Sequence, residues 1–123
     1  MDLCDESKIK RINELRRKAH AFYREKSAVY RSFLEMEKAT YQDGALLKKE
    51  KELIAIGISV VMNCESCMEW HIRQALGDGA TENQIIEAIG VGIEMSGGPG
   101  TVAARFAMNV LEYYRNELKG NKE

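Results

Sequence analysis

Apolar residues recur every three or four positions along most of this chain, the spacing that places them on one face of an α-helix. Near the N-terminus, two such stripes follow one another without a clear helix breaker between them. One long helix and two shorter helices therefore both fit the pattern. Ser7 is placed to cap the first helix, and the polar positions, which include Arg16 and Arg17, predict a solvated face. The stripes consist of Ile9, Ile12, Leu15, Ala19 and Phe22, and then of Val29, Phe33 and Met36.

Gly44 interrupts this pattern, and a strongly apolar segment follows it. The run "LIAIGISVVM" at residues 53–62 is rich in β-branched residues, which would also suit a buried strand. Its charged lead-in "KKEKE" is good helix-forming sequence, and no other run in the chain offers a partner strand. A helix is therefore predicted, and because it is apolar on every side, other helices should cover it.

Breaks that contain glycine or proline divide the remaining sequence into three further predicted helices. One runs over residues 64–76, where "GDGA" supplies a glycine stop. Thr81 with Gln84 three residues later forms a capping-box signature that opens the next helix. Pro99 suits the first turn of the last helix. The apolar positions of these last two helices are Ile85, Ile89 and Ile93, and then Val102, Phe106, Val110 and Tyr114.

The predicted fold class is therefore all-α. We expect one domain over residues 1–123, in which an N-terminal helical arm (1–42) precedes a core (44–115). Several predicted helix faces are too apolar to face water, and late glycines would allow helices to approach closely. Assembly into a homo-oligomer would bury such faces. The glycines are Gly90, Gly92, Gly97, Gly98 and Gly100.

The charge balance argues against two classes of partner. The chain has 18 Lys and Arg against 19 Asp and Glu, so it carries no excess of positive charge. Neither nucleic acid nor an anionic membrane is therefore expected to bind it. The run at 53–62 is about half of the roughly 20 residues needed to cross a bilayer. The start "MDLCDESKIK" is polar and acidic, unlike a secretion signal, so a cytoplasmic protein is expected.

The candidate chemistry lies in "NCESCMEWH" at residues 63–71. At the start of a helix, Cys64 would meet unpaired N–H groups and the positive end of the helix dipole, which both favour a thiolate. Cys67 lies one turn further on the same face, close enough for a disulfide to form. His71 is one turn beyond Cys67, where an imidazole can take up and return the proton of a thiol. This pattern predicts a redox dithiol.

Two alternatives remain beside the redox interpretation. A metal site is disfavoured because structural zinc needs four donors, and this motif offers only two thiols and one imidazole. An iron–sulfur cluster needs four thiolates, whereas the chain has three cysteines, and Cys4 near the terminus is interpreted as a stray exposed thiol. The two motif cysteines could also be structural thiols in a packed helix. Spacing alone leaves Glu52 open, either as a solvated member of "KKEKE" or as a group lying under the site.

The segment "KELIAIGISVVMNCESCMEWHIRQAL", followed by "GATENQIIEAI", resembles the carboxymuconolactone decarboxylase superfamily, and within it the alkyl hydroperoxidase D (AhpD)-like branch. The resemblance rests on a glutamate, two cysteines and a histidine at matching spacing: Glu52, Cys64, Cys67 and His71. It implies an all-α fold in which a buried helical hairpin carries the dithiol, assembled as a trimer or hexamer. It also implies that Glu52 and His71 relay protons to Cys67, and that Cys64 closes the disulfide. Some members carry a histidine just before the second cysteine, where this chain has Ser66.

The resemblance further implies a thiol-dependent enzyme that reduces hydroperoxides or disulfides through a Cys64–Cys67 cycle. Such a cycle requires no metal or organic cofactor, and its electrons would come from a protein dithiol or a lipoyl-type reductant. Two other functions remain open. One is a lyase that acts on a ring-cleavage lactone, and the other is a non-catalytic oligomeric module whose cysteines only pack.

Overall fold

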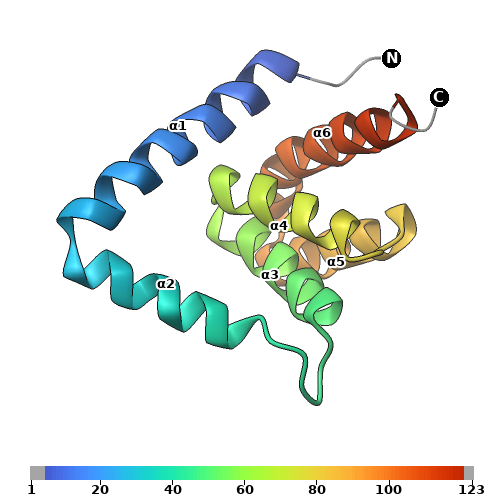
Figure 1. The fold of residues 1–123 in the computed structure, drawn as a ribbon. Helices are drawn as coiled ribbons and strands as arrows, with labels where there is room; N and C mark the ends of the chain where they lie inside the picture. Colours follow the sequence, from blue (N-terminus) through green and yellow to red (C-terminus); the bar gives the residue numbers. More distant parts are fainter. Residues whose placement is uncertain (1–4, 121–123) are drawn as a thin grey trace.

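The computed structural model describes residues 5–120, and these residues form helices joined by short connections (Figure 1). No strand occurs within this part of the chain, so the all-α prediction is confirmed. Cys4 lies outside the described residues. The helices are α1 (Glu6–Lys26), α2 (Ala28–Thr40), α3 (Lys48–Met62), α4 (Glu65–Gly77), α5 (Glu82–Ser96) and α6 (Gly98–Gly120).

The N-terminal pattern folds as two helices because Ser27 interrupts it. Ser27 adopts an extended backbone conformation, and its hydroxyl accepts a hydrogen bond from the Tyr30 N–H at 3.0 Å, which starts α2. The expected cap of α1 was wrong, because Asp5 takes that position and Ser7 lies inside the helix. The Asp5 carboxylate accepts from the Lys8 N–H at 3.1 Å, and its negative charge is also favourable at a helix N-terminus.

Helices α3 to α6 pack together into the core, and α1 and α2 form a V-shaped arm beside it (Figure 1). Ile9 in α1 is fully buried in this core, whereas α2 contributes no buried residue. The stripe predicted for the first helix is therefore only partly a core face, since Leu15 is 66% exposed and Phe22 is 59% exposed. The fully buried large aliphatic residues of the core helices are Ile56, Met68, Ile72, Ile85, Ile89 and Val110.

Two glycines set the distance between α3 and α5. A Cβ atom at Gly92 would lie 2.6 Å from the Gly57 carbonyl oxygen and 2.8 Å from Cβ of Val60, closer than real Cβ contacts. Only glycine allows this approach of the two backbones. Gly90, two residues earlier, has open space where a Cβ would be. Close approach was thus correctly predicted for Gly92, whereas no helix in the described part of the chain approaches Gly90.

One face of α3 remains uncovered within a single chain. Ile54 and Ile58 are each 51% exposed, and Val91 and Met95 of α5 are still more exposed beside them. The other helices of one chain therefore cover α3 only in part, and full coverage, which was expected of an oligomer, stays a prediction. Among the described residues, no helix combines the length and the apolar character that crossing a bilayer requires.

Candidate active site

The turn between α3 and α4 delivers Cys64 to the beginning of a helix. Helix α3 ends at Asn63, which adopts the left-handed conformation with φ 52°. The N–H of Asn63 donates to the Val60 carbonyl at 3.1 Å, and the N–H of Cys64 donates to the Ser59 carbonyl at 3.0 Å. These two bonds form a Schellman motif, which stops α3 and lets α4 begin at the next residue. Asparagine is one of the few non-glycine residues that tolerate this position.

Cys64 lies at the beginning of α4, as predicted, where it is the N-cap residue. Its sulfur accepts a hydrogen bond from the Cys67 N–H at 3.2 Å. The two sulfurs are joined as a disulfide, with the Cα atoms 5.2 Å apart. The pair lies at the N-terminus of α4, beside the first-turn N–H groups and the positive end of the helix dipole. This environment favours a thiolate when the disulfide is reduced.

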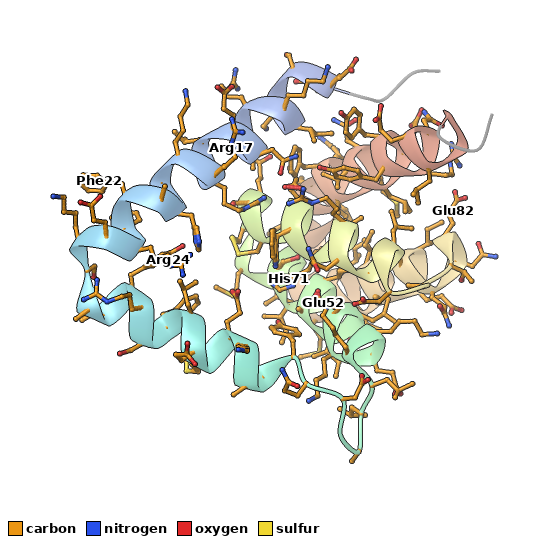
Figure 2. The ribbon with its side chains drawn as sticks, in the orientation of Figure 1. Arg17, Phe22, Arg24, Glu52, His71 and Glu82 are labelled. Carbon is orange, nitrogen blue, oxygen red and sulfur yellow. A yellow bond between two sulfur atoms is a disulfide. The ribbon has the colours of Figure 1, made fainter. Side chains whose placement is uncertain are left out.

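A buried carboxylate holds the imidazole that follows the pair. Glu52, on α3, is 1% exposed, and its Oε1 lies 3.2 Å from Nδ1 of His71 on α4, with Oε2 at 3.4 Å. Figure 2 shows the two side chains meeting between these helices. A carboxylate accepts hydrogen bonds, so Nδ1 carries the hydrogen and donates a hydrogen bond to Glu52. The other ring nitrogen, Nε2, is then free to act as a base.

Tyr41 completes the surroundings of the imidazole from the end of α2. Its ring lies against that of His71, with centroids 5.5 Å apart and planes tilted by 32°. Burial, together with the negative charge of Glu52, raises the pKa of Tyr41 above its ordinary value. The phenol therefore stays neutral around neutral pH. No motif in the sequence identifies this residue, because it lies thirty positions before His71, just after the end of α2.

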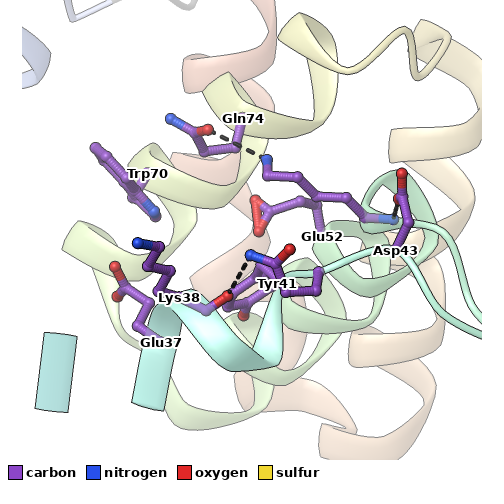
Figure 3. A pocket seen from close by; sticks show the side chains of 9 residues that line it. Glu37, Lys38, Tyr41, Asp43, Glu52, Trp70 and Gln74 are labelled. Carbon is purple, nitrogen blue, oxygen red and sulfur yellow. Dashed lines mark hydrogen bonds between the residues drawn. The ribbon is translucent and has the colours of Figure 1, made fainter. Parts of the chain in front are cut away.

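A polar cavity of about 400 Å³ opens beside Glu52 (Figure 3). Figure 3 shows the Glu52 carboxylate turned toward this space, with Tyr41, Trp70 and Gln74 around it. Glu52 and Tyr41 belong both to the cavity wall and to the surroundings of His71, so these two side chains lie between the cavity and the imidazole. Its lining residues are Glu37, Lys38, Tyr41, Gln42, Asp43, Lys48, Glu52, Trp70 and Gln74.

A second charged network lies between α1 and the beginning of α4. Arg16, predicted to be solvated, instead contacts Glu69, which is fully buried; the atoms Nη1 and Oε1 are 2.5 Å apart. Tyr114 also donates to this carboxylate, at 3.0 Å, and Arg73 Nε lies 3.7 Å from it. Burial, together with the charge of Glu69, raises the pKa of Tyr114 to about 12. No motif or periodicity in the sequence indicates that this carboxylate is buried.

In the structure the four predicted residues form two pairs. Cys64 and Cys67 form the disulfide, Glu52 and His71 form the carboxylate–imidazole pair, and His71 stands one turn after Cys67 on the same helix. His20 lies elsewhere, because its Nδ1 is 2.8 Å from the Tyr30 hydroxyl in the arm. The arrangement can store two electrons in the sulfur pair and move a proton beside it.

Comparison with known proteins places this chain in a family. The sequence pattern of the carboxymuconolactone decarboxylase family matches residues 27–109. The chain belongs to this family. Its predicted membership is therefore confirmed, and the matched range contains the disulfide together with Glu52 and His71.

One sequence relative and two solved structures resemble this chain over most of their length. An uncharacterised protein of Cupriavidus necator is 38% identical over 104 residues, covering 85% of this chain and 89% of the relative. A carboxymuconolactone decarboxylase family protein from Legionella pneumophila has a TM-score of 0.77 and 29% identity, covering 88% of this chain and 98% of that one. A family protein from Thermotoga maritima, described with a possible role in the antioxidative response, has a TM-score of 0.84 and 26% identity. This match covers 92% of our chain and 97% of that one.

Proposed function

We propose that this protein is an AhpD-like thiol oxidoreductase that reduces hydroperoxides or disulfides through a Cys64–Cys67 dithiol/disulfide cycle. The observation that carries the proposal is the joined sulfur pair at the start of α4, followed one turn later by the imidazole that Glu52 holds. The antioxidative role suggested for the Thermotoga maritima relative is consistent with it. The cycle requires no metal or organic cofactor.

In the oxidative half of the cycle, the Cys67 thiolate attacks one oxygen of the hydroperoxide. The O–O bond breaks, an alcohol leaves with one proton, and Cys67 becomes a sulfenic acid. The Cys64 sulfur then attacks the Cys67 sulfur, the hydroxyl group leaves as water, and the S–S bond forms. The hydroperoxide gains two electrons, which the two thiols lose.

The geometry of the imidazole supports a proton role for Glu52 and His71. The Glu52 carboxylate holds Nδ1–H, which leaves Nε2 available to take the Cys67 proton before attack and to return it to the leaving group. Since Glu52 lines the polar cavity, solvent protons can reach the pair from that side.

In the reductive half, an external dithiol restores the thiols. A protein dithiol or a lipoyl-type reductant attacks the Cys64 sulfur, Cys67 leaves as a thiolate, and the resulting mixed disulfide is resolved by the donor's second thiol. A disulfide substrate would be reduced by the same exchange in the opposite direction.

Mass spectrometry tests the cycle directly. In a Cys4→Ser background, one equivalent of hydroperoxide added to the reduced protein should remove two hydrogens, mapped to a cross-link between Cys64 and Cys67. Cys64→Ser should halt at an oxidised Cys67, whereas Cys67→Ser should lose the rapid reaction with peroxide. Thiols that stay reduced, or lactone turnover that survives alkylation of both cysteines, would refute the proposal in favour of a packing module or a lyase.

The proton role has its own test. Glu52→Gln should lower kcat/KM for the peroxide by about 10²-fold, the lower end of what a positioned acid–base group contributes. Glu94→Gln, which removes an exposed carboxylate on α5, is the matched control and should leave kcat/KM unchanged. Equal rates for the two variants would remove Glu52 from the mechanism.

We also propose that the protein is a homo-oligomer, a trimer or hexamer. The open apolar face of α3 and α5 supports this, since it contains a groove of about 660 Å³ lined mainly by aliphatic side chains. Ile58→Glu would place a charge in this groove and should reduce the mass measured by light scattering to that of one chain. A wild-type protein that is already monomeric at micromolar concentration would contradict the proposal.

A further inference from the structure

Side chains of helix α1 contact Glu65 and Ser66, the two residues that lie between the cysteines. The Lys8 ammonium is 2.8 Å from Oε2 of Glu65. The Nη2 group of Arg16 donates to the Ser66 carbonyl oxygen at 2.6 Å and to the Ser66 hydroxyl at 2.9 Å. The segment that the disulfide closes into a ring is therefore also held from outside, by side chains that lie 50 and 57 residues earlier in the sequence.

The other half of the same guanidinium is fixed in the protein interior. Nη1 of Arg16 donates to the buried Glu69 at 2.5 Å and to Oδ1 of Asn13 at 3.2 Å. The guanidinium also lies 5.3 Å from the centre of the Trp70 ring. With its side chain 23% exposed, Arg16 forms a rigid bridge between Glu69 and the turn that contains Ser66.

We infer that Arg16 is a positioning residue for the Cys64–Cys67 couple, and that its bridge between Ser66 and Glu69 favours the disulfide over the dithiol. The bridge is made to the turn in the conformation in which the sulfurs are bonded. Reduction adds two electrons and two protons from an external dithiol, breaks the S–S bond and gives the turn more freedom. An interaction that is stronger in the oxidised form makes the disulfide harder to reduce. The inference rests on the proposed redox cycle.

The charge of Arg16 acts in the opposite direction, but more weakly. A cation near the sulfurs favours a thiolate and hence the reduced form. Here the Glu69 carboxylate lies 2.5 Å from the guanidinium and compensates most of that charge, since Glu69 itself is fully buried. The bridge to Ser66 should therefore outweigh the charge, so that Arg16 favours the disulfide over the dithiol.

Equilibration with dithiothreitol tests this sign. The full chain, the Arg16→Gln variant and the Arg16→Lys variant are brought to equilibrium over a range of dithiothreitol ratios. Free thiols are then alkylated and counted by mass spectrometry. Both variants should be easier to reduce, by about tenfold in the equilibrium constant or about 30 mV, which corresponds to one lost charge-assisted hydrogen bond. Arg16→Lys should not restore the wild-type equilibrium constant, because a single ammonium group cannot bridge Ser66 and Glu69 as the planar guanidinium does.

The controls separate this inference from the proposed cycle. Arg17→Gln removes an exposed arginine next to Arg16 and should leave the equilibrium constant unchanged. The role assigned to Arg16 would be overturned if Arg16→Gln had the same equilibrium constant for reduction as the wild type. It would also be overturned if Arg16→Gln were harder to reduce and Arg16→Lys returned the constant to the wild-type value. A wild-type pair that dithiothreitol cannot reduce would instead refute the cycle itself.

A second measurement needs no substitution, so it holds even if loss of Arg16 leaves Glu69 uncompensated and unfolds the chain. By reciprocity, reduction of the disulfide must weaken the attachment of α1. Amide hydrogen exchange in the wild-type protein should therefore be faster over residues 6–17 in the reduced form than in the oxidised form. Identical exchange in the two forms would show that the helix and the couple are not linked.

Discussion

The close approach of α3 and α5 at Gly92 leads to a sharp prediction. Replacing Gly92 with alanine would put a methyl group 2.6 Å from the Gly57 carbonyl oxygen, so α3 and α5 must separate by about 0.8 Å to reach ordinary contact at 3.4 Å. Such overpacking typically costs about 1–3 kcal/mol. Alanine in a helix interior is about 1 kcal/mol more favourable than glycine. The Gly92→Ala variant should therefore be less stable than the wild type by up to about 2 kcal/mol.

Gly90→Ala is the matched control, because it changes the same helix two residues away and meets open space. It should be stabilised by about 1 kcal/mol, so the difference between the two variants isolates the overpacking cost of about 1–3 kcal/mol. Urea unfolding followed by circular dichroism, at one protein concentration for all three chains, measures both values. If Gly92→Ala proves as stable as Gly90→Ala, the helices do not meet as closely as described.

Three further predictions concern single side chains. Tyr114 has a pKa of about 12 in the folded protein, above its ordinary value of 10.0. Its neutral form therefore contributes stability that is fully present below pH 10 and is lost as the pH rises toward 12. Tyr114→Phe should flatten this alkaline decline in urea midpoints, and an unchanged decline would count against the assignment. Tyr41→Phe should keep the rate of peroxide reduction because the phenol is neutral. Tyr41→Ala should lower kcat/KM for the peroxide by up to about tenfold, because it removes the ring beside His71. A Tyr41→Ala variant as fast as the wild type would exclude that ring contact from the mechanism. Thr81→Ala should cost about 1 kcal/mol in urea unfolding, because the Thr81 hydroxyl accepts the Gln84 N–H at 3.1 Å, and full stability would contradict the cap.

Local signals in the sequence were sufficient to locate most of the helices. The capping box at Thr81, the proline in the first turn of α6 and the N-cap position of Cys64 are properties of a few neighbouring residues, and the structure confirms each of them. The cap at Asp5 was missed because a carboxylate and a hydroxyl two residues apart are both good caps.

Long-range contacts could not be inferred in the same way. Arg16 and Glu69 each occupy an ordinary polar position, and only the docking of α1 on α4 buries the carboxylate against the guanidinium. Tyr41 reaches His71 through the path of the connection between α2 and α3, which periodicity does not determine. Glu52 was placed through family resemblance, since its spacing alone also fitted a solvated position.

The tight reversal at Asn63 has a consequence for how this chemistry can be inherited. Because α3 and α4 follow one another almost without a linker, Glu52 and His71 and both sulfurs lie within twenty consecutive residues. One short segment of the gene thus encodes the residues of the candidate site, and bringing these residues together costs little chain entropy. If the role proposed for Arg16 holds, substitutions in the arm would change the redox equilibrium of the sulfurs while the residues of the candidate site stay in register.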